Sequence, residues 1–286
     1  VINDMKVAEL GVKYPRPNLR YFSLGDLNSD SENILRELQR FKPYLLEGSA
    51  TAIAEIARVY TKSKSKFKIR IPFINTHSET LMEGERELLQ NIFSAEVYSR
   101  YGIGETGVIG VECETKNGFH IHEESFIVEV VDEMGNPLAA GQRGRILVSF
   151  FYNDVMPFLR YAVGDYGMII PEPCPCDIPT RRIRIEGRAG ETTVLHGRPI
   201  GIVQFELILS YFSNSILRFQ IVKKDADSLE VRIIPTTHFT PDVMGKLRQE
   251  FETVVGVSPD ITLVNTLPYS NRGKTKVFID ETRRRC

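Results

Sequence analysis

The sequence predicts an α/β fold: a parallel α/β sheet, then a β-rich barrel-like subdomain, then a small α+β domain at the C-terminus. Apolar runs alternate with helical periods over residues 19–105, which is typical of parallel strands joined by covering helices. Strand-like runs separated by Gly, Pro and Asn turns follow over 106–186, and a new mixture of helices and strands begins at residue 187. We therefore expect a larger domain over 1–186 and a smaller one over 187–286.

The parallel part is predicted to contain four strands and three helices. The strands cover 19–23, 44–48, 67–74 and 96–101, and the helices cover 31–41, 49–60 and 79–93. The first helix has a Ser/Asp-rich start, as expected at a helix N-terminus. The second places Ala52, Ile53, Ile56 and Val59 on one face, which predicts packing against the sheet.

The remaining elements are predicted in the same way. The β-rich runs are 108–112, 125–132, 145–150, 159–162 and 166–170. Short strands with Gly-rich and Pro-rich turns between them predict an antiparallel or barrel-like arrangement. The C-terminal part is predicted to have helices at 203–211 and 241–255, and strands at 216–223 and 229–234. About 100 residues suffice for a domain of its own.

Composition excludes several classes of protein. A formal net charge of −1 gives no electrostatic reason to expect a nucleic acid or an anionic membrane as partner. The chain has no apolar run of transmembrane length and no secretory signal, so a cytoplasmic location is expected. Four cysteines in 286 residues do not make a disulfide framework, and their clustering favours a metal site.

The first motif, Tyr101-Gly-Ile-Gly-Glu105, follows a predicted strand. Gly102, Gly104 and Gly107 also satisfy the dinucleotide-binding pattern G-x-G-x-x-G. That pattern needs a helix whose N-terminus holds the pyrophosphate, but the residues that follow are β-branched and strand-like. A plain Gly-rich turn is the other alternative at this point.

Three further motifs follow in order along the chain: Arg160-Tyr-Ala-Val-Gly-Asp165, Gly187-Arg188 and Gly273-Lys274. Together with the first motif, this order resembles the adenylate-forming ligases, and in particular their phenylacetate–CoA ligase and CapK-like branch. The resemblance implies an enzyme that forms an acyl-adenylate from ATP and a carboxylate and then passes the acyl group to a thiol. CoA is the expected acceptor, although CapK-like relatives leave another acceptor open.

The resemblance also implies roles for single residues. The Tyr101 ring would lie against adenine, and Glu105 would bind the Mg²⁺ carried by the nucleotide phosphates. Gly104 stands where the family has Ser or Thr, so Thr106 is the candidate for the missing hydroxyl contact. The full set expected to bind nucleotide is Ser78, Glu79, Tyr101, Gly102, Glu105, Thr106, Asp165 and Arg188. Ser78 and Glu79 belong to a segment that resembles the family's G-E-x-L border of the adenine pocket.

The other three motifs concern the ribose, the phosphates and the lid, which is the family's mobile C-terminal domain. Asp165 would accept hydrogen bonds from the ribose hydroxyls, whereas by itself the residue is also compatible with the start of a turn. Arg188 would reach the ribose or phosphate, and Gly190 takes the place of the family's hinge residue. Lys274 would neutralise charge at the α-phosphate during adenylation, but a Lys in a terminal loop is also compatible with a solvated position.

Three cysteines and a histidine form the most specific local signal. Cys174 and Cys176 lie in a segment that resembles P-E-P-C-P-C-G of phenylacetate–CoA ligases, and His120 lies in one that resembles their G-L-H-I. With Cys113, three thiolates and one imidazole suit a closed, structural Zn²⁺ site. His122 would point to the opposite face of its strand, so we expect His120 to be the ligand. Three reduced core cysteines with a surface histidine are the alternative; Cys286 is not expected to take part.

The resemblance runs from about Lys42 to Ile279 and lacks the family's N-terminal third with its Ser/Thr/Gly-rich phosphate loop. We therefore expect a fragment of a larger ligase, inactive by itself if that loop is required. The second hypothesis is a zinc-stabilised nucleotide-binding or interaction module without ligase activity. The acid is not specified by the sequence; an aryl acid is one candidate, and a homodimer is an open expectation.

Overall fold

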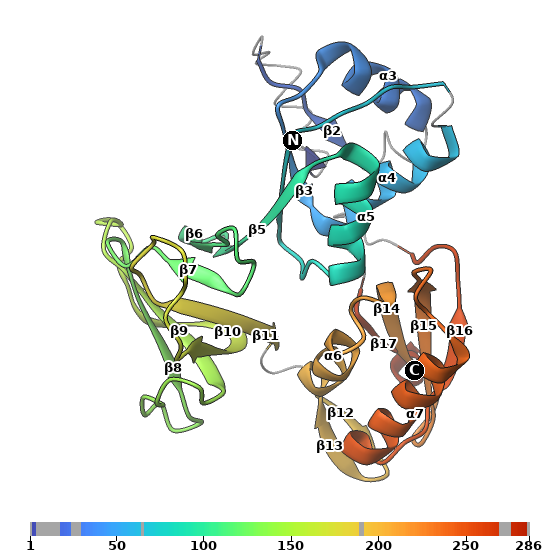
Figure 1. The fold of residues 1–286 in the computed structure, drawn as a ribbon. Helices are drawn as coiled ribbons and strands as arrows, with labels where there is room; N and C mark the ends of the chain where they lie inside the picture. Colours follow the sequence, from blue (N-terminus) through green and yellow to red (C-terminus); the bar gives the residue numbers. More distant parts are fainter. Residues whose placement is uncertain are drawn as a thin grey trace.

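The computed structural model describes residues 2–3, 18–23, 30–63, 66–188, 192–268 and 276–284, and it confirms the predicted α/β fold class. Figure 1 shows three parts: the α/β part at the top, the β-rich part on the left and the C-terminal domain at the lower right. The first two parts share one continuous sheet, in the order β2-β1-β3-β4-β5-β6-β7-β11-β10-β9-β8. No described helix is long and apolar enough to cross a membrane.

The α/β part holds parallel strands covered by helices on one face. Its elements are β1 (Ile2–Asn3), β2 (Phe22–Ser23), α3 (Ser31–Phe41), β3 (Leu45–Ser49), α4 (Ala50–Ser63), β4 (Phe73–His77), α5 (Glu83–Phe93) and β5 (Glu96–Ile103). Alternate residues of β3 and β4 are buried against the helices, as the period of a strand requires. This face includes Leu46 and Ile74, which belong to the same hydrophobic cluster as Ile53 of α4.

Two predicted elements of this part have different boundaries. The strand predicted over 67–74 is wrong over residues 67–72, because β4 begins only at Phe73. Phe67, Ile69 and Ile71 are buried in the helix-covered core instead. Their apolar side chains therefore serve core packing, and their backbone is not part of a β-ladder. The helix predicted over 79–93 begins at Glu83, where the Glu85 carboxylate accepts a hydrogen bond from the Met82 backbone and caps the helix.

The β-rich part is an antiparallel extension of the same sheet. Its strands are β6 (Gly107–Val111), β7 (Phe119–Ile121), β8 (Phe126–Val131), β9 (Gly144–Phe150), β10 (Phe158–Ile170) and β11 (Arg182–Arg188). The two runs predicted over 159–162 and 166–170 form the single long strand β10, and β11 was not predicted. Three strands separate β5 from β10 in the sheet order, yet Tyr101 Oη of β5 lies 2.7 Å from Asp165 Oδ2 of β10. The sheet therefore curls strongly, which gives this part its barrel-like character.

The C-terminal domain has its own sheet, in the order β16-β15-β14-β17, and its own core. Its elements are β12 (Thr192–Leu195), β13 (Arg198–Gly201), α6 (Ile202–Ser210), β14 (Ile216–Lys223), β15 (Leu229–Pro235), α7 (Pro241–Val255), β16 (Asp260–Leu263), β17 (Phe278–Asp280) and the short 3₁₀ helix η1 (Glu281–Arg284). Helix α7 agrees with the prediction because Thr240 caps its start and Gly256, at φ 78°, ends it. Phe205, Leu247 and Phe251 pack the two helices onto the sheet.

The described residues form three hydrophobic clusters. Their buried members lie within residues 34–97, 101–183 and 195–257, and the third cluster also takes in Met82 from the α/β part. The division into domains over 1–186 and 187–286 stays a prediction.

Candidate nucleotide site and metal centre

Three predicted nucleotide-site residues meet where β5, β10 and β11 come together. The Asp165 carboxylate accepts hydrogen bonds from Tyr101 Oη, at 2.7 Å, and from Arg188 Nε, at 3.1 Å. Asp165 and Arg188 are also paired in the ladder between β10 and β11. The Asp165 residue is 8% exposed, whereas the Arg188 side chain is 67% exposed and lies at the end of the strand that leads toward the C-terminal domain. The site is therefore a fixed carboxylate beside an accessible guanidinium.

The Tyr101–Asp165 contact has a defined proton arrangement. Burial, followed by the nearby Asp165 charge, raises the pKa of Tyr101 far above its ordinary value. Tyr101 therefore stays protonated and donates its hydroxyl proton to Asp165. A carboxylate offers about four lone-pair positions, so two acceptor positions of Asp165 remain for a ligand's hydroxyl groups.

Glu105 lies in the exposed turn after β5 and has a partner that the sequence did not reveal. Tyr161 Oη donates a hydrogen bond to Glu105 Oε1 at 3.0 Å, and this bond raises the pKa of Tyr161. Tyr161 belongs to the Arg160–Asp165 motif, but its role was not predicted, because a contact across 56 residues leaves no local signal. The contact joins the first motif to the second.

The glycine-rich turn has two distinct features. A Cβ on Gly102 would lie 2.3 Å from the Gly107 carbonyl oxygen, so the close hairpin itself requires glycine there. The chain continues from this turn into strand β6 and not into a helix, so the dinucleotide-binding alternative is wrong. Thr106 Oγ1 is buried in this turn without a hydrogen-bond partner among the described atoms. An orphaned hydroxyl at this place fits a phosphate or hydroxyl group of a nucleotide.

The other predicted nucleotide residues have mixed positions. Ser78 follows the carboxyl end of β4, is exposed, and adopts φ 68° beside His77, whose Nδ1 lies 2.8 Å from its hydroxyl. The Glu79 carboxylate accepts a hydrogen bond from the Thr51 backbone N–H at the start of α4. Gly190 and Lys274 lie outside the described residues.

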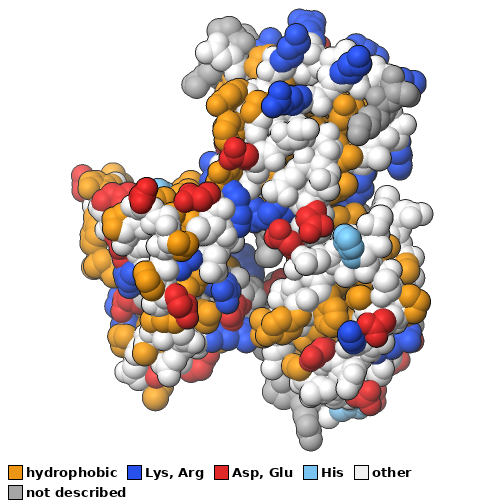
Figure 2. All heavy atoms as spheres, in the orientation of Figure 1, with side chains coloured by type: hydrophobic (Ala, Val, Ile, Leu, Met, Phe, Trp, Pro, Cys, Tyr) orange, Lys and Arg blue, Asp and Glu red, His pale blue; other side chains and the backbone are white. Residues whose placement is uncertain are grey.

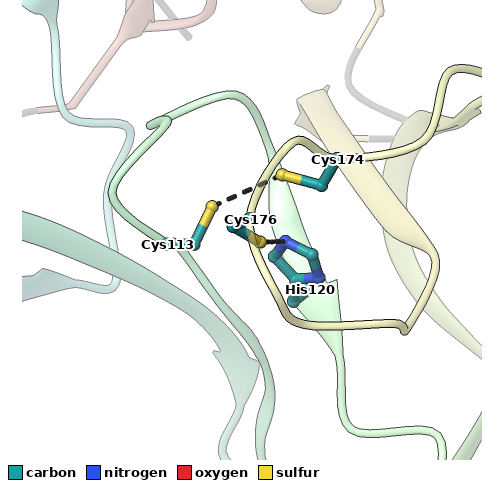
Figure 3. Close-up of side chains that lie close together, drawn as sticks. All are labelled: Cys113, His120, Cys174 and Cys176. Carbon is teal, nitrogen blue, oxygen red and sulfur yellow. Dashed lines mark hydrogen bonds between the residues drawn. The ribbon is translucent and has the colours of Figure 1, made fainter.

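The structure brings the four predicted metal ligands together. The ligand atoms of Cys113, His120, Cys174 and Cys176 all lie within 4.8 Å of one another (Figure 3). Cys113 Sγ and Cys174 Sγ are 3.6 Å apart, and Cys176 Sγ is 3.3 Å from His120 Nε2. Two thiolates on a tetrahedral Zn²⁺ with Zn–S bonds of about 2.3 Å are ~3.8 Å apart, so the donor set and its spacing fit zinc.

The surroundings of these ligands fit the same ion. His120 Nδ1 lies 3.2 Å from the Thr180 carbonyl oxygen, so a proton on Nδ1 leaves Nε2 bare toward the cysteines. Hydrogen bonds led by the one from Thr115 outweigh burial and lower the pKa of the Cys174 thiol to about 6, whereas burial raises the pKa of the neighbouring Cys176 thiol to about 11. His122 points away and pairs with Glu124 at 3.3 Å. Zinc itself stays a prediction, and Cys286 lies outside the described residues.

Comparison with known proteins gives a consistent picture. No family model matches the chain. The chain is 23% identical to the protein CapK of Staphylococcus aureus over 278 residues, which are 94% of this chain and 60% of that protein. It is 24% identical to phenylacetate-coenzyme A ligase of Thermus thermophilus, over 85% of this chain and 61% of that enzyme. The chain thus spans about 60% of the length of these relatives.

Solved structures agree with the sequence matches. The fold is similar to that of 2-hydroxyisobutyryl-CoA ligase in the postadenylation state, with TM-score 0.71 and 20% identity over 88% of this chain and 58% of the ligase. The thioesterification state of the same ligase gives TM-score 0.53 and 19% identity over 89% and 58%. The predicted resemblance is confirmed: the chain is related in sequence to CapK and the phenylacetate–CoA ligases and has the fold of adenylate-forming CoA ligases.

Proposed function

We propose that this chain is the nucleotide-binding and lid portion of an ATP-dependent carboxylate ligase that forms an acyl-adenylate and then an acyl-CoA. One observation supports the proposal: Tyr101, Asp165 and Arg188 come from three separate motifs and form one hydrogen-bonded cluster, while Glu105 is bonded to Tyr161 of the same motif as Asp165. The sequence relatives named as phenylacetate–CoA ligases support the choice of acid and thiol as substrates.

In this proposal each residue has a defined task. Asp165, fixed by Tyr101 and Arg188, accepts hydrogen bonds from the ribose hydroxyls. Arg188 adds positive charge near the phosphates, and Thr106 supplies a hydroxyl. Glu105 would hold Mg²⁺, which neutralises phosphate charge when bound. The reaction is attack of a substrate carboxylate oxygen on the α-phosphorus of ATP, with pyrophosphate as the leaving group.

The placement of the C-terminal domain supports the adenylating half of this reaction. The chain superposes better on the postadenylation state of the related ligase than on its thioesterification state, over nearly the same share of both chains. Because both structures are of one enzyme, the difference reflects the placement of its parts. We infer that the C-terminal domain acts as a lid and that the described orientation serves adenylation.

The test is ATP–pyrophosphate exchange with a panel of aryl and short-chain acids, carried out on the complete product of the gene and on this chain. Exchange above the no-acid background supports the ligase, and the preferred acid names the substrate. Nucleotide binding without exchange for any acid would overturn it in favour of the zinc-stabilised binding module. Gly104, which has open space around it where the family has Ser or Thr, is the observation that favours that second function. Use of CoA, a cytoplasmic location and homodimerisation stay predictions.

Replacing Tyr161 by Phe tests the Glu105 position. The change removes one hydrogen bond to a carboxylate, so the KM for Mg-ATP is expected to rise by about threefold to tenfold with little change in kcat. Tyr166→Phe is the matched control, because Tyr166 lies on the same strand and bonds Glu133 in an exposed pair away from the site. Equal kinetic effects of the two substitutions would contradict a role for Tyr161 in positioning Glu105.

A further inference from the structure

A buried arginine joins the lid to the α/β part. Arg218 of β14 points into the amino end of α5, where its Nε lies 2.6 Å from Glu85 Oε1. Its Nη1 lies 3.3 Å from the Thr80 carbonyl oxygen, and its Nη2 lies 3.8 Å from Glu79 Oε2. The three charged side chains are almost fully enclosed, with 10%, 0% and 10% exposure for Arg218, Glu85 and Glu79. Acidic and basic side chains gather near the junction of the parts in Figure 2.

Both carboxylates already serve the α/β part. Glu79 accepts a hydrogen bond from the Thr51 N–H at the start of α4, and Glu85 accepts one from the Met82 N–H at the start of α5. Negative charge is stabilised at helix N-termini, so these two side chains are held in place before the lid arrives. Burial raises the pKa of Glu85 to about 7, and the facing Arg218 opposes that rise. The negative charge of the buried Glu85 carboxylate therefore depends on the positive charge of Arg218 from the other domain.

The backbones also fit directly against each other. The Gly84 N–H donates a hydrogen bond to the Ser213 carbonyl oxygen of the lid at 2.8 Å. A Cβ on Gly84 would lie 2.7 Å from Thr236 Cγ2 and 3.0 Å from Ser213 O, both of them lid atoms. Met82 packs into the hydrophobic core of the lid. The lid thus sits on α5 with no room for a side chain at Gly84.

We infer that Arg218 is a positioning residue that holds the lid in its described orientation by binding the two helix-capping carboxylates Glu79 and Glu85. Gly84 provides the close backbone contact beside this ion pair. Rotation of the lid must break this contact, so the contact sets the balance between the adenylating and thioester-forming arrangements. The structural part of the inference stands on the geometry alone, whereas its effect on catalysis rests on the proposed ligase function.

Two substitutions with matched controls test the inference. Gly84→Ala places a methyl group against the lid while favouring the helix itself, because Ala is the better helix former. Gly245→Ala is its control: Gly245 lies in α7, and an added Cβ there meets nothing within 4 Å. Arg218→Met removes the charge, and Lys246→Met removes an exposed charge of the lid that pairs with Asp242.

Amide hydrogen exchange and small-angle scattering test the contact between the lid and α5 without requiring ligase activity. The first N–H groups of a helix have no partner within it, so Gly84 N–H depends on Ser213. We expect exchange in residues 80–86 to quicken by about tenfold or more in Gly84→Ala and Arg218→Met, since breaking a buried pair is costly. The radius of gyration should increase, and both controls should match the wild type.

In the ligase assay the same two variants should lose adenylation while thioester formation from preformed adenylate persists, and Arg218→Lys should restore part of the adenylation.

The outcomes separate the two proposals. Unchanged exchange and scattering in Gly84→Ala would overturn the positioning role, even if Arg218→Met failed to fold. Equal loss of both half-reactions in a folded Arg218→Met would also overturn it. If hydrogen exchange changes as expected in the variants but the wild type shows no ATP–pyrophosphate exchange, the ligase function is wrong and the structural role of Arg218 stands.

Discussion

Replacing Cys174 by Ser is expected to release about one equivalent of zinc per chain and to lower the melting temperature by about 10 °C or more. Cys113 follows β6, whereas Cys174 and Cys176 lie in the connection between β10 and β11, so an ion bound to all three joins two distant loops. Ligation energy of a structural site is folding energy, and loss of one ligand removes much of it. Native mass spectrometry and differential scanning calorimetry measure the two effects.

The two histidines on one strand provide the control for this experiment. His120→Gln should behave like Cys174→Ser, because Nε2 of His120 faces the Cys176 thiol. His122→Gln should keep its zinc, because the His122 ring pairs with Glu124 outside the cluster. Cys286→Ser should keep it too. Wild-type chain that contains no zinc and whose cysteines all titrate freely in the native state would eliminate the metal centre.

How much of the fold was predictable depends on local signals. Helices α3 and α7 have caps in the sequence, and their predicted boundaries agree with the structure. Phe67 to Ile71 was predicted as a strand because its apolar residues alternate, and that periodicity is the same for a segment packed under helices. Strand β11 was missed because it is rich in arginine, although it lies inside the sheet between β7 and β10 and its Arg182 is buried.

The candidate site divides in the same way. Residue types with a chemical signature were predicted individually. The structure brings Asp165 together with Tyr101 at one site, and the three cysteines together with His120 at another. Partners without a signature were not predicted. Tyr161 reaches Glu105 across 56 residues, and Arg218 reaches Glu85 across 133. Such contacts follow from the curl of the sheet and from domain docking, which no local pattern encodes. Glu79 stays a prediction as a nucleotide-binding residue, and its contacts with the Thr51 backbone and with Arg218 were not predicted.

Asp165 and Lys274 are expected to leave different kinetic marks. Asp165 is fixed on β10 by Tyr101 and Arg188, so its proposed ribose contact is the same before and during the reaction. If the proposed ligase function holds, Asp165→Ala in the complete product of the gene should therefore mainly raise the KM for ATP, as expected for a contact made equally in ground and transition states. A fall in kcat at unchanged KM would contradict the ribose assignment.

Lys274→Ala is expected to lower the adenylation rate by about 100-fold or more, the scale of losing one charged contact to a transition state. Its ammonium would act where the α-phosphate gains negative charge as the carboxylate attacks and pyrophosphate departs. Lys274 lies outside the described residues, but the chain just after it is anchored, since the buried Gln220 of β14 donates a hydrogen bond to the Lys276 carbonyl oxygen. Lys276→Ala, which keeps that backbone bond and removes an exposed neighbouring charge, is the control and should react at the wild-type rate.

Thioester formation from preformed adenylate should survive in Lys274→Ala, because the lid must leave the adenylating orientation before that step. If both half-reactions fell equally, Lys274 would be serving the fold of the lid and not the chemistry at the α-phosphate.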